Sequence, residues 1–252
     1  EAGGWGATPG VKLLTVKGLD DLGRGQTDWL ANAVYWAADN GAKVINMSWG
    51  MWSVAPGPEV LKNAIGFAHD ECGCVLVASA GNDMRAVYPD NPPLYYKKPY
   101  PAFWDSCIAV GATTITDEKA YYSNYSLPIL SWVDVAAPGG YPQPLPEDQI
   151  LSTLPTYSDF FLRTKYNLNT DYDYLPGTSM AAPYVAGLAG LILSKWPELT
   201  NLQVRERILG SVDNIIPPNP DLARTQIIGT GRINAYKALT LNEEPVLHYW
   251  DH

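Results

Sequence analysis

The sequence predicts an α/β domain of three layers, in which helices cover both faces of a mostly parallel sheet. Short runs of apolar or β-branched residues alternate along the chain with segments whose apolar residues recur at helical spacing. This alternation is typical of a parallel sheet, whose strands are buried on both faces. The chain has 252 residues, of which 46% are hydrophobic, so a single domain can bury a large core.

Each predicted element follows from its local pattern. The predicted strands are short and mostly apolar or β-branched, and they lie at residues 12–16, 44–47, 75–78, 108–110 and 133–136. Apolar residues recur at helical spacing between the first three strands, which predicts helices over 29–37 and 61–68. Residues 180–193 are the longest apolar segment and are expected to form a buried core helix. Thr200 is a favourable N-cap for a last helix, which ends before the proline-rich residues 217–220.

Charge and cysteine content exclude some classes of function. The net charge of −9 argues against a nucleic-acid partner, because phosphate binding requires clustered Lys and Arg. No run of about 18 apolar residues occurs, so no membrane span is expected. The cysteines, Cys72, Cys74 and Cys107, do not form the pattern of a disulfide framework. Their odd number leaves at least one thiol unpaired or with a partner upstream of this chain.

One serine stands where a polar loop changes into the longest apolar helix. It is Ser179, within residues 177–183, which read GTSMAAP. Backbone N–H groups at a helix N-terminus lack partners, and the helix dipole there favours negative charge. A hydroxyl in this position therefore suits a nucleophile, although the ordinary interpretation of such a serine is an N-cap.

Five segments of the chain together resemble one protein family. They are residues 44–50 (VINMSWG), 75–82 (VLVASAGN), 131–139 (SWVDVAAPG), 177–187 (GTSMAAPYVAG) and 229–239 (GTGRINAYKAL). In content, order and spacing they resemble the subtilisin-like serine proteases, or subtilases, and most of all the thermitase-like branch. That family usually has His where Tyr184 stands here, a difference that bears on packing and not on chemistry. The resemblance extends over nearly the whole chain and implies a subtilisin-like fold.

The resemblance also implies an active site that hydrolyses peptide bonds through an acyl-enzyme. Ser179 would be the nucleophile. The side-chain amide of Asn82 would form the oxyanion hole with the backbone N–H of Ser179. The ordinary interpretation of residues 81–83 is a turn, since Gly and Asn favour turns. No cofactor is implied for catalysis.

Two segments resemble substrate-binding parts of the family. The first resembles the edge that pairs with an extended substrate backbone, and its members are Ser48, Trp49 and Gly50. The second resembles the wall of the primary specificity pocket, and its members are Ala78, Ser79, Ala80 and Gly81. These small, uncharged residues predict acceptance of large apolar or aromatic substrate side chains. A core position is the ordinary alternative for Trp49. The implied partners are polypeptide substrates and, in the full-length protein, a propeptide.

The family's catalytic Asp and His precede a block that resembles residues 10–17, so both are expected upstream of Glu1. We therefore expect residues 1–241 to be a subtilase catalytic domain without its N-terminal part, with a C-terminal tail at 242–252. This piece alone is expected to be inactive. The chain's own histidines are interpreted as structural or solvated, and they are His69, His248 and His252.

Two other interpretations stay open. A catalytically dead relative would be a peptide-binding module that uses residues 48–50 to hold an extended peptide. A different α/β hydrolase is less well supported, because the sequence has no Gly-x-Ser-x-Gly elbow.

Two long loops, at residues 84–99 and 156–175, adjoin the motifs and are expected to rim the substrate cleft. The second loop contains Asp159, Asp171 and Asp173, interpreted as a solvated acidic loop because the spacing lacks the Gly and Glu of an EF-hand. The resemblance allows structural Ca²⁺ in the full-length protein but assigns no residue of this chain to it. It further implies a cis peptide bond before Pro101 and a secreted or cell-surface protein.

Overall fold

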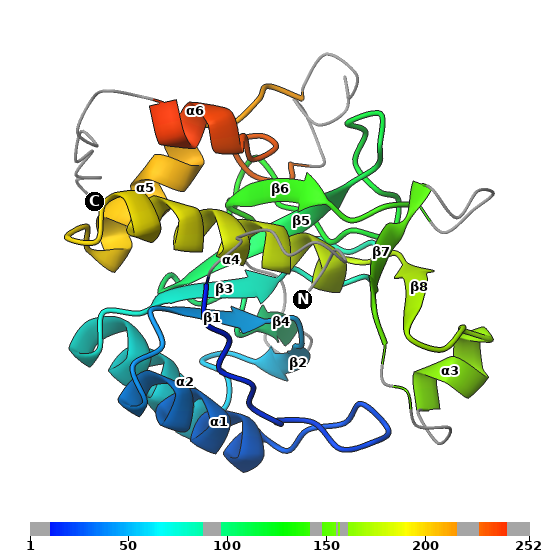
Figure 1. The fold of residues 1–252 in the computed structure, drawn as a ribbon, viewed down its shortest axis with the longest axis horizontal. Helices are drawn as coiled ribbons and strands as arrows, with labels where there is room; N and C mark the ends of the chain where they lie inside the picture. Colours follow the sequence, from blue (N-terminus) through cyan, green and yellow to red (C-terminus); the bar gives the residue numbers. More distant parts are fainter. Residues whose placement is uncertain are drawn as a thin grey trace.

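A parallel sheet of four strands lies at the centre of the structure, in the order β1-β3-β5-β6 (Figure 1). The computed structural model describes residues 11–87, 97–141, 148–154, 156, 161–215 and 227–240. The strands of the sheet are β1 (Val44–Met47), β3 (Val75–Ser79), β5 (Cys107–Thr113) and β6 (Val135–Pro138). In the register of the sheet, Val77 is aligned with Asn46 on one side and with Ile108 on the other. Among the described residues, β1 is therefore an edge strand.

Helices cover both faces of this sheet, which confirms the predicted α/β fold. The helices of one face are α1 (Thr27–Asp39), α2 (Glu59–Gly66) and the π-helix η1 (Phe67–Glu71). Those of the other face are α4 (Thr178–Lys195), α5 (Asn201–Gly210) and α6 (Ala235–Thr240). Figure 1 shows α4 running along the sheet, on the side away from α1 and α2.

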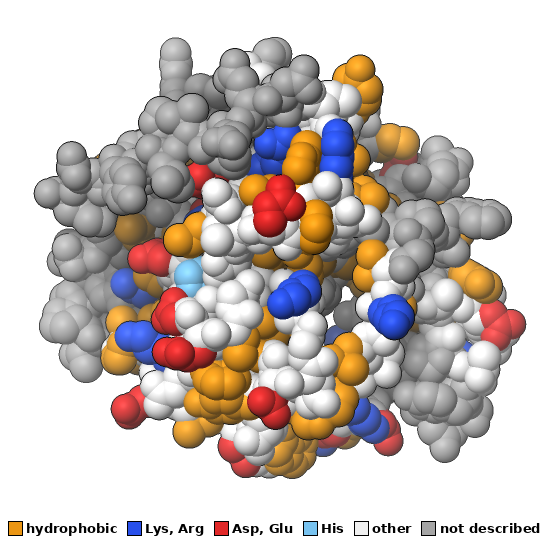
Figure 2. Space-filling model, turned by 60° about the vertical axis from the view of Figure 1, so that its left-hand side comes forward, with side chains coloured by type: hydrophobic (Ala, Val, Ile, Leu, Met, Phe, Trp, Pro, Cys, Tyr) orange, Lys and Arg blue, Asp and Glu red, His pale blue; other side chains and the backbone are white. Residues whose placement is uncertain are grey.

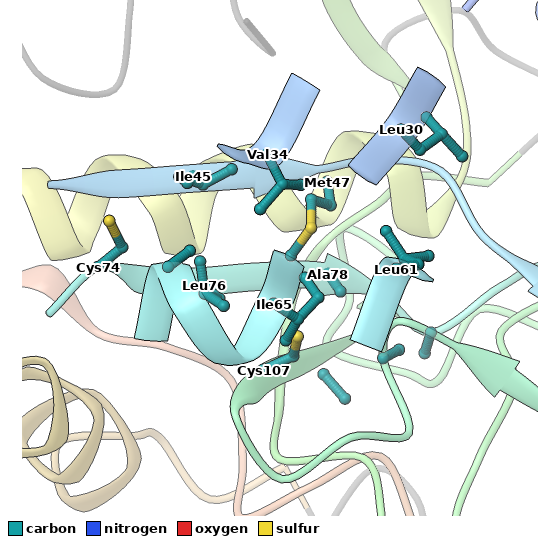
Figure 3. Close-up of a cluster of buried hydrophobic side chains, with 14 of the residues drawn as sticks. Leu30, Val34, Ile45, Met47, Leu61, Ile65, Cys74, Leu76, Ala78 and Cys107 are labelled. Carbon is teal, nitrogen blue, oxygen red and sulfur yellow. The ribbon is translucent and has the colours of Figure 1, made fainter. Parts of the chain in front are cut away.

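The two faces have separate hydrophobic cores, because successive side chains of a strand point to opposite sides. Leu76 and Ala78 of β3 pack with residues of α1 and α2, whose side chains point toward the sheet in Figure 3. Val75 and Val77 of the same strand pack against α4. All residues of β3 and β5 are buried, as expected for strands covered on both faces.

Two antiparallel strand pairs lie outside the central sheet, and the sequence does not predict them. The first consists of β2 (Met51–Val54) and β4 (Lys97–Tyr100). The second consists of β7 (Ile150–Thr153) and β8 (Tyr172–Leu175), with the short helix α3 (Phe161–Tyr166) between them in sequence. Most residues of β2, β7 and β8 keep some exposed surface, so these strands lack the continuous apolar pattern of the central sheet. The second pair leads directly into α4.

One predicted strand is wrong. Residues 12–16 form neither a strand nor a helix, whereas the other predicted strands are confirmed as β1, β3, β5 and β6 with small shifts of their ends. The apolar side chains of the segment are 37% to 61% exposed, and they are Leu13, Leu14 and Val16. A strand needs a neighbour for its backbone N–H and C=O groups, and this segment pairs with no strand of the described structure.

The predicted helices are confirmed. Residues 29–37 lie within α1, residues 61–68 extend from α2 into η1, and residues 180–193 lie within α4. The last predicted helix is α5, which begins after Thr200. Thr200 and Gln203 form a capping box: the Thr200 side chain accepts from the backbone N–H of Gln203, and the Gln203 side chain accepts from the backbone N–H of Thr200.

Three smaller expectations can also be compared with the structure. Cys72, Cys74 and Cys107 are free thiols, and the peptide bond between Tyr100 and Pro101 is cis. Within the described ranges, no helix is long and apolar enough to cross a membrane. The predicted tail at 242–252, which contains His248 and His252, lies outside the described residues.

The surface over α1 and α2 mixes apolar and charged side chains. Figure 2 shows apolar side chains between acidic and basic ones in the lower part of that face. Trp29 and Trp36 of α1 contribute to this apolar surface, with exposed fractions of 45% and 48%. The described side chains on this face form no continuous basic surface.

An ionic cluster around Asp213 fixes the C-terminal part of the described chain. The Asp213 carboxylate accepts hydrogen bonds from Arg232 Nη2 at 2.7 Å and from Asn234 Nδ2 at 2.9 Å. Lys237 Nζ lies 2.8 Å from the same carboxylate. The hydrogen bond from Lys237 is the main cause that lowers the pKa of Asp213 below its ordinary value. The cluster therefore joins the end of α5 to α6 and to the segment before it.

The stability of the protein should depend on pH through Asp213. A carboxylate whose pKa is lower in the folded than in the unfolded state stabilises the fold above the unfolded value of about 3.9, and this contribution is lost as pH falls through the folded value. Asp213→Asn should therefore lower the urea midpoint at about pH 7. The difference from the wild type should shrink below about pH 4. Urea unfolding at both pH values tests this, with Asp39→Asn, an exposed aspartate at the end of α1, as the control. An unchanged difference at low pH would contradict it.

Candidate active site

The candidate site lies at the carboxyl ends of β1 and β3. Parallel strands end at the same edge of a sheet, so the residues that follow them lie side by side. Ser48 directly follows β1, and Asn82 follows the end of β3. The N-terminus of α4 meets both segments there. Ser179 is consequently in hydrogen-bond contact with Ser48, although 131 positions separate them in sequence.

Gly177 makes the turn that starts α4. Its φ is +149°, a value that residues with a side chain rarely adopt. Its carbonyl accepts the first hydrogen bonds of the helix, from the N–H groups of Met180 at 3.0 Å and Ala181 at 3.2 Å. Ser179 is the residue before Met180, so its N–H lies in the first turn and has no acceptor within the helix. It lies at the positive end of the helix dipole, where negative charge is favoured.

Ser179 and Ser48 hold each other through two hydrogen bonds. Ser179 Oγ donates to the carbonyl of Ser48 at 3.1 Å, and Ser48 Oγ donates to the carbonyl of Ser179 at 2.8 Å. Ser48 Oγ in turn accepts from Asn46 Nδ2 at 2.9 Å. The Ser179 carbonyl is available because Pro183, four residues later, has no N–H to donate to it. The proline in the motif thus allows the start of α4 to be tied to β1.

Two hydrogen bonds from Thr178 fix the orientation of the Asn82 side chain. The Asn82 Oδ1 atom accepts from the backbone N–H of Thr178 at 2.9 Å and from its hydroxyl at 2.9 Å. These donors identify which end of the carboxamide is the oxygen. The hydroxyl of Thr178 also accepts from the N–H of Gly81 at 3.1 Å. The Asn82 Nδ2 group is left without an acceptor in the described part of the chain.

The Nδ2 atom of Asn82 and the backbone nitrogen of Ser179 both lie close to the space that the missing side chain of Gly177 leaves. A Cβ atom placed on Gly177 would lie 3.5 Å from Asn82 Nδ2 and 3.7 Å from the Ser179 nitrogen. The absence of a side chain at Gly177 therefore leaves room beside both donors. Two N–H donors next to a hydroxyl can stabilise the negative charge that develops on a carbonyl oxygen when that hydroxyl attacks it.

The predicted substrate-binding residues differ in their exposure. Ser48 and Trp49 are half-buried and Gly50 is exposed, so this segment reaches the surface beyond β1. Ala78 and Ala80 have no exposed surface and belong to the core that faces α1 and α2. The other predicted pocket residues are Ser79, which is buried, and Gly81, which is partly exposed. The pocket-wall role of Ala78, Ser79, Ala80 and Gly81 stays a prediction.

His69 lies at the opposite end of the sheet from Ser179. It belongs to η1, which precedes β3, whereas the candidate site follows that strand. The strand alone spans about 16 Å. The Nδ1 atom of His69 lies 2.6 Å from a carboxylate oxygen of Asp70, and its carbonyl accepts from Asn201. His69 thus has the structural position that the sequence predicts for it, and it is the only histidine in the described ranges.

The acidic loop holds no cluster of metal ligands in the part that the structure describes. Asp173 accepts hydrogen bonds from the N–H groups of Asn169 at 2.6 Å and of Tyr174 at 2.7 Å, so its carboxylate stabilises the loop backbone. No group of three His, Cys, Asp or Glu side chains suited to a metal ion occurs among the described residues. Asp159 and residues 88–96 of the first long loop lie outside them.

Sequence reasoning missed the role of Thr178. Its hydroxyl and its N–H together hold the carbonyl end of Asn82, which fixes the orientation of the whole carboxamide. A signal was present, because Thr178 directly precedes the nucleophile candidate in the motif. Its partner is distant in sequence, however, and only the fold brings the two side chains together.

Comparison with known proteins gives one consistent result. The sequence model of the subtilase family matches residues 1–231. The chain is 36% identical over 234 residues to thermitase of Thermoactinomyces vulgaris, an alignment that covers 93% of this chain and 67% of thermitase. It is 34% identical over 235 residues to a thermophilic serine proteinase of Bacillus sp. (strain AK1), with 93% of this chain covered. The chain spans 47% of that proteinase, about half its length.

A similar structure has also been solved. The crystal structure of a lanthipeptide protease superposes with a TM-score of 0.76 and 27% sequence identity. The superposition covers 94% of this chain and 72% of that protein. The arrangement of sheet and helices is therefore shared over almost all of the chain.

Thr178→Val should destabilise the site without changing the volume of the side chain. It removes the hydroxyl that donates to Asn82 and the acceptor of the Gly81 N–H, which should cost about 1–3 kcal/mol of unfolding free energy. Urea unfolding measures this cost, and hydrogen exchange should be faster at the Gly81 amide. Thr113→Val is the matched control, because Thr113 is equally buried and its hydroxyl has no hydrogen-bond partner in the described structure. Equal losses in the two variants would contradict the assignment.

Proposed function

Because the chain belongs to the subtilase family, we propose that it carries the nucleophile of a serine endopeptidase. One observation supports this most strongly: the Asn82 Nδ2 atom and the backbone nitrogen of Ser179 lie 3.5 Å and 3.7 Å from one point, the place where a Cβ atom on Gly177 would stand. Acyl transfer needs a nucleophile and two such donors in this arrangement.

The proposed reaction has two stages. Ser179 Oγ attacks the carbonyl carbon of a peptide bond, forms a C–O bond and loses its proton to a base. The carbonyl π electrons move to the oxygen, which becomes an oxyanion bound by the Ser179 N–H and Asn82 Nδ2. As this intermediate collapses, the amine leaves with the proton from the base, and an acyl-enzyme remains. A water molecule, activated by the same base, then hydrolyses the ester and regenerates Ser179.

We propose that the base and the carboxylate that orients it are a His and an Asp supplied by sequence outside this chain. The position of His69 at the far end of the sheet supports this. The group that now accepts the Ser179 proton in a hydrogen bond is the carbonyl of Ser48. An amide carbonyl is far too weak a base to remove that proton at neutral pH, so another group must take its place.

The substrate is proposed to be an extended polypeptide. Among the described residues β1 is an edge strand, and this supports the proposal, because residues 48–50 continue that edge and a peptide backbone can add to it. The small, uncharged residues from Ala78 to Gly81 favour a pocket for large apolar or aromatic side chains. Secretion, a propeptide and structural calcium are further proposals for the full-length protein.

A catalytically dead peptide-binding module is the alternative. The hydrogen bond from Ser179 Oγ to a backbone carbonyl, with no base beside it in the described ranges, favours this second function. Such a module would use the same edge at residues 48–50 to hold a peptide.

Covalent labelling of the nucleophile separates the two functions. The protein should be expressed from its complete coding sequence and treated with a fluorophosphonate, which reacts with activated serines. We expect stoichiometric labelling in the wild type and none in Ser179→Ala, because Ser179 provides the attacking oxygen. Ser126→Ala, which removes a buried serine hydroxyl elsewhere, should keep the label. A folded full-length protein that is not labelled would overturn the protease proposal and favour the peptide-binding module.

Asn82→Ala should lower kcat and leave KM almost unchanged. The Nδ2 group contacts the oxyanion, which exists only after the attack, so its loss affects the transition state more than substrate binding. The expected decrease is about 10²–10³-fold, a cost that was measured on subtilisin, a member of this same family. Steady-state hydrolysis of a peptide substrate tests it. Asn40→Ala, which removes a carboxamide at the end of α1, is the control. A decrease of kcat below about 3-fold in Asn82→Ala would exclude it as an oxyanion donor.

A further inference from the structure

A buried asparagine from outside the motifs, Asn124, holds the segment that carries Asn82. Its side chain has no exposed surface. Its Nδ2 atom donates to the carbonyl of Ala80 at 2.8 Å. Its Oδ1 atom accepts from the backbone N–H groups of Asp83 at 3.1 Å and Arg85 at 3.0 Å. One carboxamide thus binds the backbone on both sides of Asn82.

Gly81 lies directly against the same side chain. The backbone N–H of Asn124 donates to the carbonyl of Gly81 at 3.0 Å. A Cβ atom on Gly81 would overlap with Asn124 Nδ2. The φ of Gly81 is +100°, which also favours glycine. The turn before Asn82 is therefore shaped to fit the buried carboxamide, and no side chain at position 81 would leave that contact intact.

A weaker contact holds the outer side of the segment. Trp52 Nε1 donates to Asp83 Oδ2 at 2.8 Å, and Asn124 Nδ2 lies 3.4 Å from the same oxygen. The guanidinium of Arg85 lies 5.9 Å from the centre of the Trp52 ring. Asp83 and Arg85 are exposed to solvent and Trp52 is half-buried, so these groups add less to the position of the segment than the buried Asn124 does.

We propose that Asn124 is a positioning residue that sets the place of the oxyanion donor Asn82. The inference rests on the proposed protease function. An oxyanion donor must be held within a few tenths of an ångström of its working position, and errors of about 1 Å cost about 10²-fold in rate. Asn82 itself is exposed, and within the described structure its side chain is held by Thr178 alone. The backbone of its neighbours is held by Asn124, which fixes where the Asn82 side chain begins.

Only a carboxamide meets both requirements at position 124. The segment presents a carbonyl, which needs a donor, and two N–H groups, which need an acceptor. Asn supplies both from one rigid group. In Asn124→Asp, a carboxylate oxygen would face the carbonyl of Ala80 and the carboxylate of Asp83, and a charge would be buried. In Asn124→Ala, the three hydrogen bonds to the backbone and the longer contact with the Asp83 carboxylate would all be lost.

A double-mutant cycle in the full-length protein tests the proposal. Asn124→Ala should lower kcat by about 10- to 100-fold with KM within about 3-fold of the wild type. In an Asn82→Ala background the same substitution should change kcat by less than about 3-fold, because the residue through which it acts is already gone. Fluorophosphonate titration gives the fraction of competent Ser179 in each variant, so kcat refers to folded protein alone.

Ser126→Ala is the matched control. Ser126 lies two positions after Asn124, is equally buried, and its Oγ accepts from two backbone N–H groups, those of Trp132 and Val133. Its loss should lower the urea midpoint and leave kcat unchanged. Trp52→Phe is the milder variant if Asn124→Ala fails to fold. It removes the hydrogen bond to Asp83 and should lower kcat by about 5-fold, again only when Asn82 is present.

Two results would overturn the proposal. Equal decreases of kcat with and without Asn82 would mean that Asn124 supports the fold in general and not the donor. An unchanged side-chain ¹⁵N signal of Asn82 in Asn124→Ala would mean that the donor does not move, where we expect a shift and faster exchange with water. This second measurement does not need activity. The ¹⁵N signal of Asn82 therefore tests the positioning role on its own. Failure of the protease function would be seen separately, as absence of fluorophosphonate labelling in the wild type.

Discussion

The rest of the site depends on Pro183 of α4, which has no backbone N–H to donate within the helix. A proline in the second turn of a helix cannot donate to the carbonyl four residues earlier, so the carbonyl of Ser179 needs a donor from elsewhere. The hydroxyl of Ser48 is that donor, at 2.8 Å, and Ser179 Oγ donates to the carbonyl of Ser48 in return. These bonds tie the start of α4 to the end of β1. With the helix start in this place, Thr178 can hold Asn82, and the missing side chain of Gly177 leaves space between the two N–H donors.

Burial along α4 makes this arrangement rigid. The helix residues that face the sheet are apolar or small, and they are Ala181, Ala182, Val185, Leu188, Ala189 and Ile192. They pack on side chains of β3, β5 and β6 that belong to the same core. Polar contacts are concentrated at the N-terminus of the helix, where the candidate nucleophile lies. A site whose reactive groups stand at the ends of buried strands and a buried helix keeps its geometry better than one built on loops alone.

The sequence predicts the parts of this structure that depend on local pattern. The strand at 75–78 is a short apolar run that is buried throughout, and the strand at 44–47 buries Ile45 and Met47. The motif around Ser179 combines a turn, a helix start and a proline. The strand predicted at 12–16 is wrong because a strand also depends on a partner, which a local pattern does not reveal. Asn124 escaped notice for a related reason. Its partner Asp83 lies 41 positions away, and a lone Asn between tyrosines and serines carries no signal of its contacts.

The two halves of the proposed chemistry have different origins in the chain. The proposed oxyanion donors lie on short, fixed segments, because the backbone around residues 80–85 and the start of α4 are held by contacts within the described residues. The base that would accept the Ser179 proton is not in place within the described residues. The Ser179 hydroxyl donates instead to the carbonyl of Ser48, which cannot act as a base. A base that binds the Ser179 proton must first displace this hydrogen bond. The donors need no such rearrangement. Preorganised donors lower the energy of the oxyanion whatever base removes the proton, so this half of the site can be tested separately from the other.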